Sequence, residues 1–277
     1  MLLSSRRFSL RVGGLLLGLA FATSGAAQSF TATHAKVGLV AENNSLQPGQ
    51  TAWVGVLFDL EKGWHIYWVN PGDSGERPKI QWQLPPGFQA KEIRWPTPVR
   101  LGGGTVIDYG YEGRVLLPVP IRVPADYKPA KPVTLSADVR YLICREVCIP
   151  ARAQATLSIP SANASAVAAD RELFRSAFDN APKAWPSGWK AQVRDNGGFF
   201  VLSLDTGTSE PKATFFPLEE DQIDNAAVQG VAPYPRGVVI KLKKSDQLLK
   251  PISALKGVVV LGPGRAFEVS APVAGKK

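Results

Sequence analysis

The chain has 277 residues, 45% of them hydrophobic, and a formal net charge of +9. This apolar fraction is that of a globular protein with a hydrophobic core, and the length suits two domains of ordinary size. Because lysine and arginine stand singly rather than in blocks, the positive charge favours solubility and argues against a nucleic-acid-binding protein.

The first residues predict a signal peptide over residues 1–27. Arg6, Arg7 and Arg11 form a positive region, an apolar run follows, and small residues precede an expected cleavage site near Ala27. The apolar run is too short for a membrane span, which takes about 20 residues, and no later segment is long enough. We therefore expect an exported protein that does not itself span the membrane.

Residues 28–160 predict an all-β domain built from many short strands. Apolar residues alternate over 37–41, and a longer apolar strand is predicted over 52–60. An aromatic-rich strand over 64–69 ends at a turn signal in residues 70–73, which read Asn-Pro-Gly-Asp.

A further strand is predicted over residues 115–123, although it contains Pro118 and Pro120. Because proline cannot donate a hydrogen bond to a strand ladder, we expect this strand at a sheet edge or with a bulge. Many short strands separated by turns favour a β-sandwich over a barrel or an α/β fold.

The clearest periodicity surrounds the two cysteines of the chain, Cys144 and Cys148. Alternate residues are apolar over 133–143 and again over 151–159. Two half-buried strands with a short link between them predict a β-hairpin. In this alternation Cys144 falls with the polar residues of its strand, so we expect its sulfur on the outward, accessible face.

A single close cysteine pair in an exported protein is either a structural disulfide or a redox couple. Four residues of extended strand span about 13 Å, beyond the roughly 7 Å limit on Cα separation in a disulfide, so the pair closes only if the link turns back. A five-residue loop stabilises the fold by only about 2 kcal/mol, against about 3 kcal/mol for fifteen residues. Since tight, exposed disulfides exchange more readily, the residues favour a redox couple and leave a structural disulfide open.

Five short motifs stand in a fixed order around these strands. They occupy residues 63–75, 84–88, 109–113, 116–120 and 143–150. Together they resemble the N-terminal periplasmic domain of the DsbD and ScsB thiol:disulfide interchange proteins, over about residues 30–160.

The resemblance implies an immunoglobulin-like β-sandwich and a periplasmic location. In that family the cysteine pair receives electrons from a membrane-embedded thiol electron-transfer protein and passes them to periplasmic acceptors, which are thioredoxin-like or other disulfide proteins. The resemblance makes Cys144 and Cys148 the catalytic pair, with no cofactor and no metal. One sulfur attacks a partner disulfide as a thiolate, and the other resolves the mixed disulfide.

The sequence departs from this family in three respects. The cysteine spacing, with three residues between, is shorter than in the best-known members. We find neither the transmembrane electron-transfer domain nor the thioredoxin-like domain of full-length members, so we expect a separate membrane protein to supply electrons. The best-known members shield the pair with an aromatic residue on a cap loop, whereas residues 101–107 contain three glycines and no aromatic residue. Our candidate shielding or proton-transfer neighbours are His65, Tyr67, Tyr109 and Tyr111, although ordinary strand packing is the favoured interpretation of His65 and Tyr67.

Beyond residue 160 the composition changes. Residues 161–185 predict a linker and a short helix from about 170 to 180. Residues 186–277 predict a second, smaller β-rich domain without cysteine or histidine, for which docking to a partner is the preferred role. The segment 214–221 is a candidate contact, although a strand followed by an acidic turn explains it equally well.

Two other functions stay open on the sequence alone. The first is a non-catalytic periplasmic binding module in which the disulfide is structural. The second is a thiol-based copper-handling protein, because exposed thiols bind Cu(I). A single methionine and two histidines argue against a dedicated copper carrier.

Overall fold

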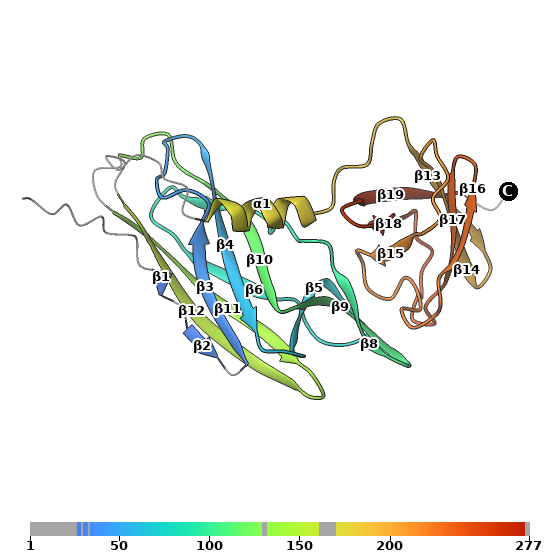
Figure 1. The fold of residues 1–277 in the computed structure, drawn as a ribbon, viewed down its shortest axis with the longest axis horizontal. Coiled ribbons are helices and arrows are strands. Elements are labelled where there is room, and N and C mark those ends of the chain that lie inside the picture. The colour runs from blue at the N-terminus through green and yellow to red at the C-terminus, as the bar shows by residue number, and fades with distance from the viewer. Residues whose placement is uncertain (1–26, 29, 33, 129–131, 161–169, 275–277) are drawn as a thin grey trace, which may run out of the picture.

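The chain folds into two parts that lie side by side, an N-terminal β-sandwich and a C-terminal β-sheet (Figure 1). The prediction of an all-β fold with an immunoglobulin-like sandwich, a second β-rich part and one short helix is confirmed. The expected signal peptide up to residue 26 and most of the predicted linker lie outside the described residues. This computed structural model describes residues 27–28, 30–32, 34–128, 132–160 and 170–274.

The sandwich consists of two antiparallel sheets. The first has the strand order β1-β12-β11-β5-β9-β8, with β6 paired to β11 off this path, and the second has the order β2-β3-β4-β10-β7. The strands of the first sheet are β1 (Ala27–Gln28), β5 (His65–Gly72), β6 (Lys79–Gln83), β8 (Val99–Gly103), β9 (Val106–Glu112), β11 (Val133–Cys144) and β12 (Cys148–Ile159). Those of the second are β2 (Phe30–Ala32), β3 (Ala35–Ala41), β4 (Thr51–Leu60), β7 (Gln89–Ala90) and β10 (Arg114–Arg122).

Apolar side chains from both sheets form one hydrophobic core. In β3, Val37 and Leu39 are fully buried, whereas Lys36 is exposed. Phe58 of β4 packs edge-on against Tyr141 of β11, with 5.2 Å between the ring centroids. Successive side chains of a strand point to opposite faces, so the inner face of each strand fills the core. The outer face is left for other contacts.

β10 meets the expectation for a strand with two prolines only in part. It lies between β4 and β7 rather than at the edge of the sheet, and it pairs with β4 without a bulge. On its other side, β7 pairs with only the last two residues of β10. The carbonyl oxygens of Pro118 and Pro120 accept hydrogen bonds from the backbone N–H groups of Arg94 and Lys91, outside the regular ladder. The missing proline donors thus face the side of β10 where the pairing is irregular.

The predicted hairpin is confirmed, and the end of the aromatic-rich strand differs from expectation. β11 and β12 pair without interruption from Val133 opposite Ile159 to the two cysteines. β5 continues through the predicted turn to Gly72, with a register shift against β9 after Tyr67. The Asn70 side chain accepts a hydrogen bond from the Gly72 N–H, which supports this irregular strand end.

The helix and the C-terminal sheet complete the molecule. Helix α1 (Arg171–Asn180) buries Phe174 and Ala177 against Leu116 of β10, on the outer face of the second sandwich sheet. The C-terminal sheet has the order β15-β18-β19-β13-β14-β17-β16. Its strands are β13 (Lys190–Asn196), β14 (Phe199–Asp205), β15 (Thr214–Pro217), β16 (Gly230–Tyr234), β17 (Gly237–Lys243), β18 (Ala254–Val260) and β19 (Ala266–Ala274).

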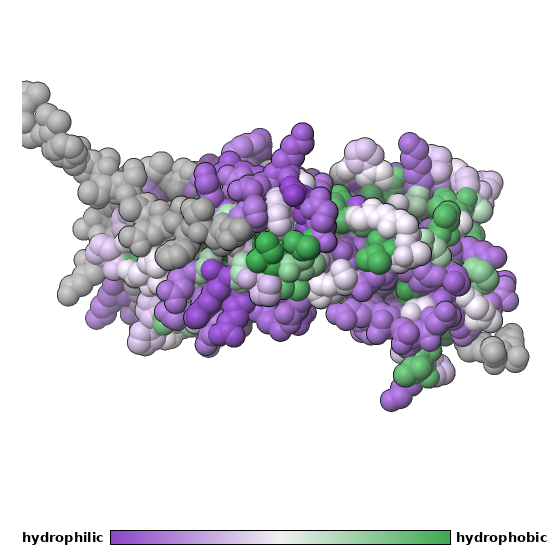
Figure 2. Space-filling model, turned by 90° about the horizontal axis from the view of Figure 1, so that it is seen from below, coloured by the Kyte–Doolittle hydropathy of each residue, from purple (hydrophilic) through white to green (hydrophobic). Residues whose placement is uncertain are grey.

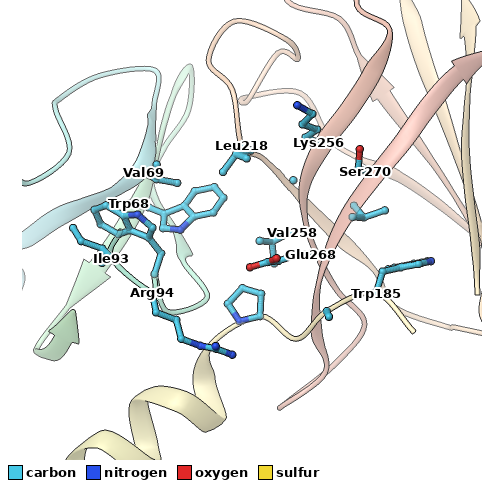
Figure 3. Close-up of a pocket in the computed structure, with 15 residues that line it drawn as sticks. Trp68, Val69, Ile93, Arg94, Trp185, Leu218, Lys256, Val258, Glu268 and Ser270 are labelled. Atoms are coloured by element: carbon cyan, nitrogen blue, oxygen red, sulfur yellow. The ribbon is translucent and has the colours of Figure 1, made fainter. Parts of the chain in front are cut away.

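The two parts touch along a seam. Phe216 of β15 packs edge-on against Trp68 and Tyr109 of the sandwich, at centroid distances of 6.4 and 5.3 Å. Figure 2 shows one face of the molecule, which is mostly hydrophilic, with hydrophobic side chains gathered beside this junction. The seam also contains a cavity of about 570 Å³. Its walls include Trp68, Ile93 and Arg94 from the sandwich and Trp185, Val258 and Glu268 from the C-terminal part (Figure 3).

Candidate active site

The two cysteines form a disulfide at the end of the β11–β12 hairpin. Cys144 is the last residue of β11 and Cys148 the first of β12, and they lie directly opposite each other with 4.1 Å between their Cα atoms. The backbone N–H of Arg145 donates to the carbonyl of Val147 at 3.1 Å and closes the link. The chain thus turns back between the cysteines, as disulfide geometry requires.

The two cysteines differ in exposure, and this corrects one expectation. Cys144 does lie on the outer face of its strand, but it is only 2% exposed. Its neighbour in the sheet is His65 of β5, and the side chain of Tyr67, two residues further, covers it. Cys148 is exposed. The accessible cysteine is therefore Cys148, not Cys144.

The pairing of β5 with β11 places Tyr67 and His65 beside the disulfide. The Tyr67 hydroxyl donates a hydrogen bond to Cys144 Sγ at 2.8 Å and lies 3.4 Å from Cys148 Sγ. The rings of His65 and Tyr67 are perpendicular, with 5.3 Å between their centroids. Both side chains are buried. Of the four candidate neighbours, these two contact or adjoin the pair.

Tyr109 and Tyr111 lie elsewhere. They are buried in the sandwich core with Ile66, which pairs with Tyr111 across the β5–β9 ladder. The Tyr109 hydroxyl donates to Asn225 Oδ1 and the Tyr111 hydroxyl donates to the carbonyl oxygen of Pro96, each at 2.8 Å. The expectation that they replace the aromatic shield is not met by these contacts, because their hydroxyls are engaged away from the sulfurs.

Ser74 and Gly75, which follow β5, complete the site. The sequence did not predict that they belong to it. Ser74 donates from its N–H and its hydroxyl to the Asp108 carboxylate at 3.0 Å. Gly75 lies against the Tyr67 ring so closely that a Cβ there would fall 2.1 Å from Tyr67 Cζ, and its φ is +83°. Only glycine fits both conditions without strain. The signal was the run Pro71-Gly72-Asp73-Ser74-Gly75, which reads as a turn.

Burial shifts the pKa values of three side chains of the site in the direction of their neutral forms. It lowers the pKa of His65 below its ordinary value, although attraction to Asp108 and Glu112 opposes this. Burial also raises the pKa of the Tyr67 phenol, so the hydroxyl keeps its proton at neutral pH. The pKa of Asp108 is likewise raised by burial, against its hydrogen bonds from Ser74. Tyr67 is thus a hydrogen-bond donor toward sulfur.

The described residues form neither a metal site nor a membrane-spanning helix. They contain no group of three or more histidine, cysteine or acidic side chains that could hold a metal ion. None of the helices in the described part of the chain is long and apolar enough to cross a bilayer.

Comparison with known proteins supports the resemblance. Residues 36–160 match the family model described as thiol:disulfide interchange protein DsbD, N-terminal. Among solved structures, the chain is similar to the N-terminal periplasmic domain of ScsB from Proteus mirabilis, with a TM-score of 0.69 and 19% identity, covering 91% of this chain and all of that one. A comparison with curated protein sequences gave no match. Because the structural similarity covers 91% of the chain, the shared fold extends beyond the sandwich into the C-terminal sheet.

Proposed function

We propose that this chain, whose residues 36–160 match the N-terminal domain family of the DsbD interchange proteins, is a periplasmic thiol:disulfide exchange module. Its Cys144–Cys148 pair cycles between disulfide and dithiol. The observation that carries the proposal is the asymmetry of the pair: one sulfur belongs to an exposed residue, and the other is buried under a tyrosine hydroxyl.

The asymmetry assigns a role to each sulfur. In the reduced protein, the Cys148 thiolate attacks a disulfide of the acceptor, and a mixed disulfide forms as one acceptor thiolate leaves. The Cys144 thiolate then attacks Cys148 Sγ, the Cys144–Cys148 disulfide forms again, and the second acceptor thiolate leaves. Two electrons pass to the acceptor, whose two thiolates take up the two protons lost from the cysteines.

The return step needs a dithiol donor. A thiolate of a membrane-embedded dithiol protein attacks Cys148 Sγ, a mixed disulfide forms, and Cys144 leaves as a thiolate. The second donor thiolate then attacks the first donor sulfur, so that the donor disulfide forms and Cys148 leaves as a thiolate. The two cysteines take up the two protons that the donor thiols lost. The exposed link supports this step, because residues 145–148 are all exposed and a donor protein can reach Cys148. Thioredoxin-like or other periplasmic disulfide proteins are the proposed acceptors.

The position of the disulfide argues against a purely structural role. It joins two residues that the unbroken β11–β12 ladder already holds opposite each other. A disulfide that closes so short a loop removes little entropy from the unfolded chain, about 2 kcal/mol. Exchange chemistry explains why a disulfide stands at this hairpin end.

Single-cysteine variants test the proposal. Cys144→Ala keeps the exposed sulfur and Cys148→Ala keeps the buried one, so each is the matched control of the other. With an aromatic disulfide reagent at neutral pH, we expect Cys144→Ala to form the mixed disulfide about tenfold faster or more, because access limits exchange. If both variants form the mixed disulfide equally slowly, the result would contradict the exchange function and favour a structural role for the disulfide.

A further inference from the structure

We infer that Asn225 of the C-terminal sheet is a positioning residue for the disulfide, acting through residues 73–75 and Tyr67. The inference rests on the proposed exchange function and adds that the C-terminal sheet tunes the reactivity of the pair. It follows from a continuous set of contacts that leads from the seam to the sulfurs.

Asn225 belongs to the C-terminal part of the chain, and its side chain and backbone carbonyl form hydrogen bonds with residues of the sandwich. It lies between β15 and β16 and is 7% exposed. Its side-chain amide donates to Asp73 Oδ1 at 2.8 Å, and its Oδ1 accepts from the Tyr109 hydroxyl at 2.8 Å. Its backbone carbonyl accepts from the Arg100 guanidinium at 2.7 Å. These hydrogen bonds satisfy the buried Asn225 amide with partners from the sandwich. They therefore fix the positions of Asn225 and of its sandwich partners relative to each other.

Asp73 connects Asn225 to the residues of the site, because it is also hydrogen-bonded to the sandwich and directly precedes Ser74 and Gly75. Its second carboxylate oxygen accepts from the Ile107 N–H at 2.7 Å, and its own N–H donates to the Ile107 carbonyl at 3.0 Å. The next two residues are those of the site: Ser74 binds Asp108, and Gly75 packs on the Tyr67 ring.

A second contact anchors the other end of this segment. Asn70 is 1% exposed, and its amide donates to the carbonyls of Pro217 and Glu219, at 2.9 and 3.1 Å. Residues 70–75 are therefore held by the C-terminal sheet at Asn70 and at Asp73, while Gly75 holds the ring of Tyr67. Since the Tyr67 hydroxyl lies 2.8 Å from Cys144 Sγ, this segment sets the hydrogen bond that the sulfur receives.

The consequence is specific to the reduced pair. A hydrogen bond from Tyr67 stabilises a thiolate more than a thiol, because bonds to charged groups are stronger. A looser segment 70–75 weakens that bond, so the pKa of the Cys144 thiol in the reduced protein rises.

The test is the pH profile of iodoacetamide alkylation of Cys144 in the full-length Cys148→Ala protein, where the only thiol is the one that receives the Tyr67 hydrogen bond. For Asn225→Ala in this protein we expect a higher pKa of Cys144 and a rate at pH 7 that falls about threefold or more, because a weakened hydrogen bond stabilises the thiolate less. Gln229→Ala is the matched control, because that amide bonds only to the Phe215 backbone within the C-terminal sheet. Its profile should equal that of Cys148→Ala alone.

A double-mutant cycle shows whether the effect passes through Tyr67. In a Tyr67→Phe background, Asn225→Ala should leave the pH profile unchanged. A shift that persists there, or an unchanged profile for Asn225→Ala although the wild-type pair does exchange, would overturn the inference. If the wild-type pair fails to exchange at all, the proposed function fails instead. Should Asn225→Ala not fold, Asn225→Asp keeps the size, sets a second carboxylate against Asp73, and is expected to shift the profile in the same direction.

Discussion

At the scale of single residues, Tyr67 makes the two cysteines chemically different. It covers Cys144 from the neighbouring strand and leaves Cys148 exposed. Its phenol stays protonated because burial raises its pKa. A neutral donor held against a sulfur stabilises the thiolate without bringing a charge into the site.

Replacing Tyr67 by phenylalanine isolates this hydrogen bond. In the Cys148→Ala protein, where Cys144 is the only thiol, we expect Tyr67→Phe to raise the pKa of Cys144 and to slow its alkylation at pH 7 about tenfold, as a lost bond to a charged group predicts. The measurement is the rate of iodoacetamide reaction against pH.

Tyr141→Phe is the control for this change. Tyr141 is also a buried tyrosine of the sandwich, and its hydroxyl has no hydrogen-bond partner in the described part of the chain. We expect its alkylation profile to match that of Cys148→Ala alone. Equal slowing in both variants would mean that the sandwich as a whole, and not the Tyr67 hydroxyl, sets the reactivity.

His65 makes stability depend on pH. Because burial lowers its pKa in the folded state, the folded protein binds fewer protons than the unfolded chain below the ordinary value of 6.5. The stability contributed by neutral His65 is therefore present above pH 6.5. It is lost as the pH falls from 6.5 through the lowered pKa of His65 in the folded protein. In urea denaturation at pH 7.5 and 5.5, the wild type should lose more stability than His65→Gln, which does not titrate. Equal losses in the two proteins would contradict this role.

At the scale of elements, periodicity predicted the hairpin but not the burial at its end. Alternation in residues 133–143 and 151–159 reports which face of each strand points to the core. It contains no information about what covers the outer face. The cover over Cys144 is Tyr67, which is 77 residues away in sequence and enters through the pairing of β5 with β11. Residues 73–75 were missed for the same reason, because a turn signal does not say what the turn packs against.

Gly75 tests the packing of that segment on Tyr67. An added Cβ would collide with the ring at 2.1 Å, so Gly75→Ala should lower the free energy of unfolding by about 1–3 kcal/mol through overpacking, and it should also slow alkylation. Gly104→Ala is the control, since Gly104 has a similar positive φ of +71° with no atom within 4 Å of the added Cβ. Gly104→Ala should show the backbone effect alone and leave alkylation unchanged. Normal alkylation in Gly75→Ala would contradict the packing argument.

Helix α1 provides a second test at this scale. Phe174 is fully buried against β10, and its removal leaves a cavity under the helix. We expect Phe174→Ala to lower the free energy of unfolding by about 3–5 kcal/mol in urea denaturation. Leu249→Ala, at a residue that is 87% exposed, should change it by less than about 0.5 kcal/mol. A small effect of Phe174→Ala would mean that α1 does not stabilise the sandwich.

At the scale of the whole molecule, the segment 214–221 shows that the sequence predicted a contact surface but not its partner. It was a candidate partner contact, and it does make contacts, but to the sandwich of the same chain: Phe216 packs on Trp68, and the carbonyls of Pro217 and Glu219 accept from Asn70. No local pattern distinguishes a surface for another protein from one for the rest of the chain. The division into domains at residues 160 and 185 stays a prediction, and α1 packs with the sandwich.

The most direct test of the account is the reduction potential of the Cys144–Cys148 pair, measured by equilibrating the full-length protein in glutathione or dithiothreitol buffers. We expect a value between about −120 and −270 mV, the range of exchange proteins, with the fold retained in the reduced state. A potential below about −300 mV, with loss of the sandwich on reduction, would contradict the account and assign the disulfide a structural role.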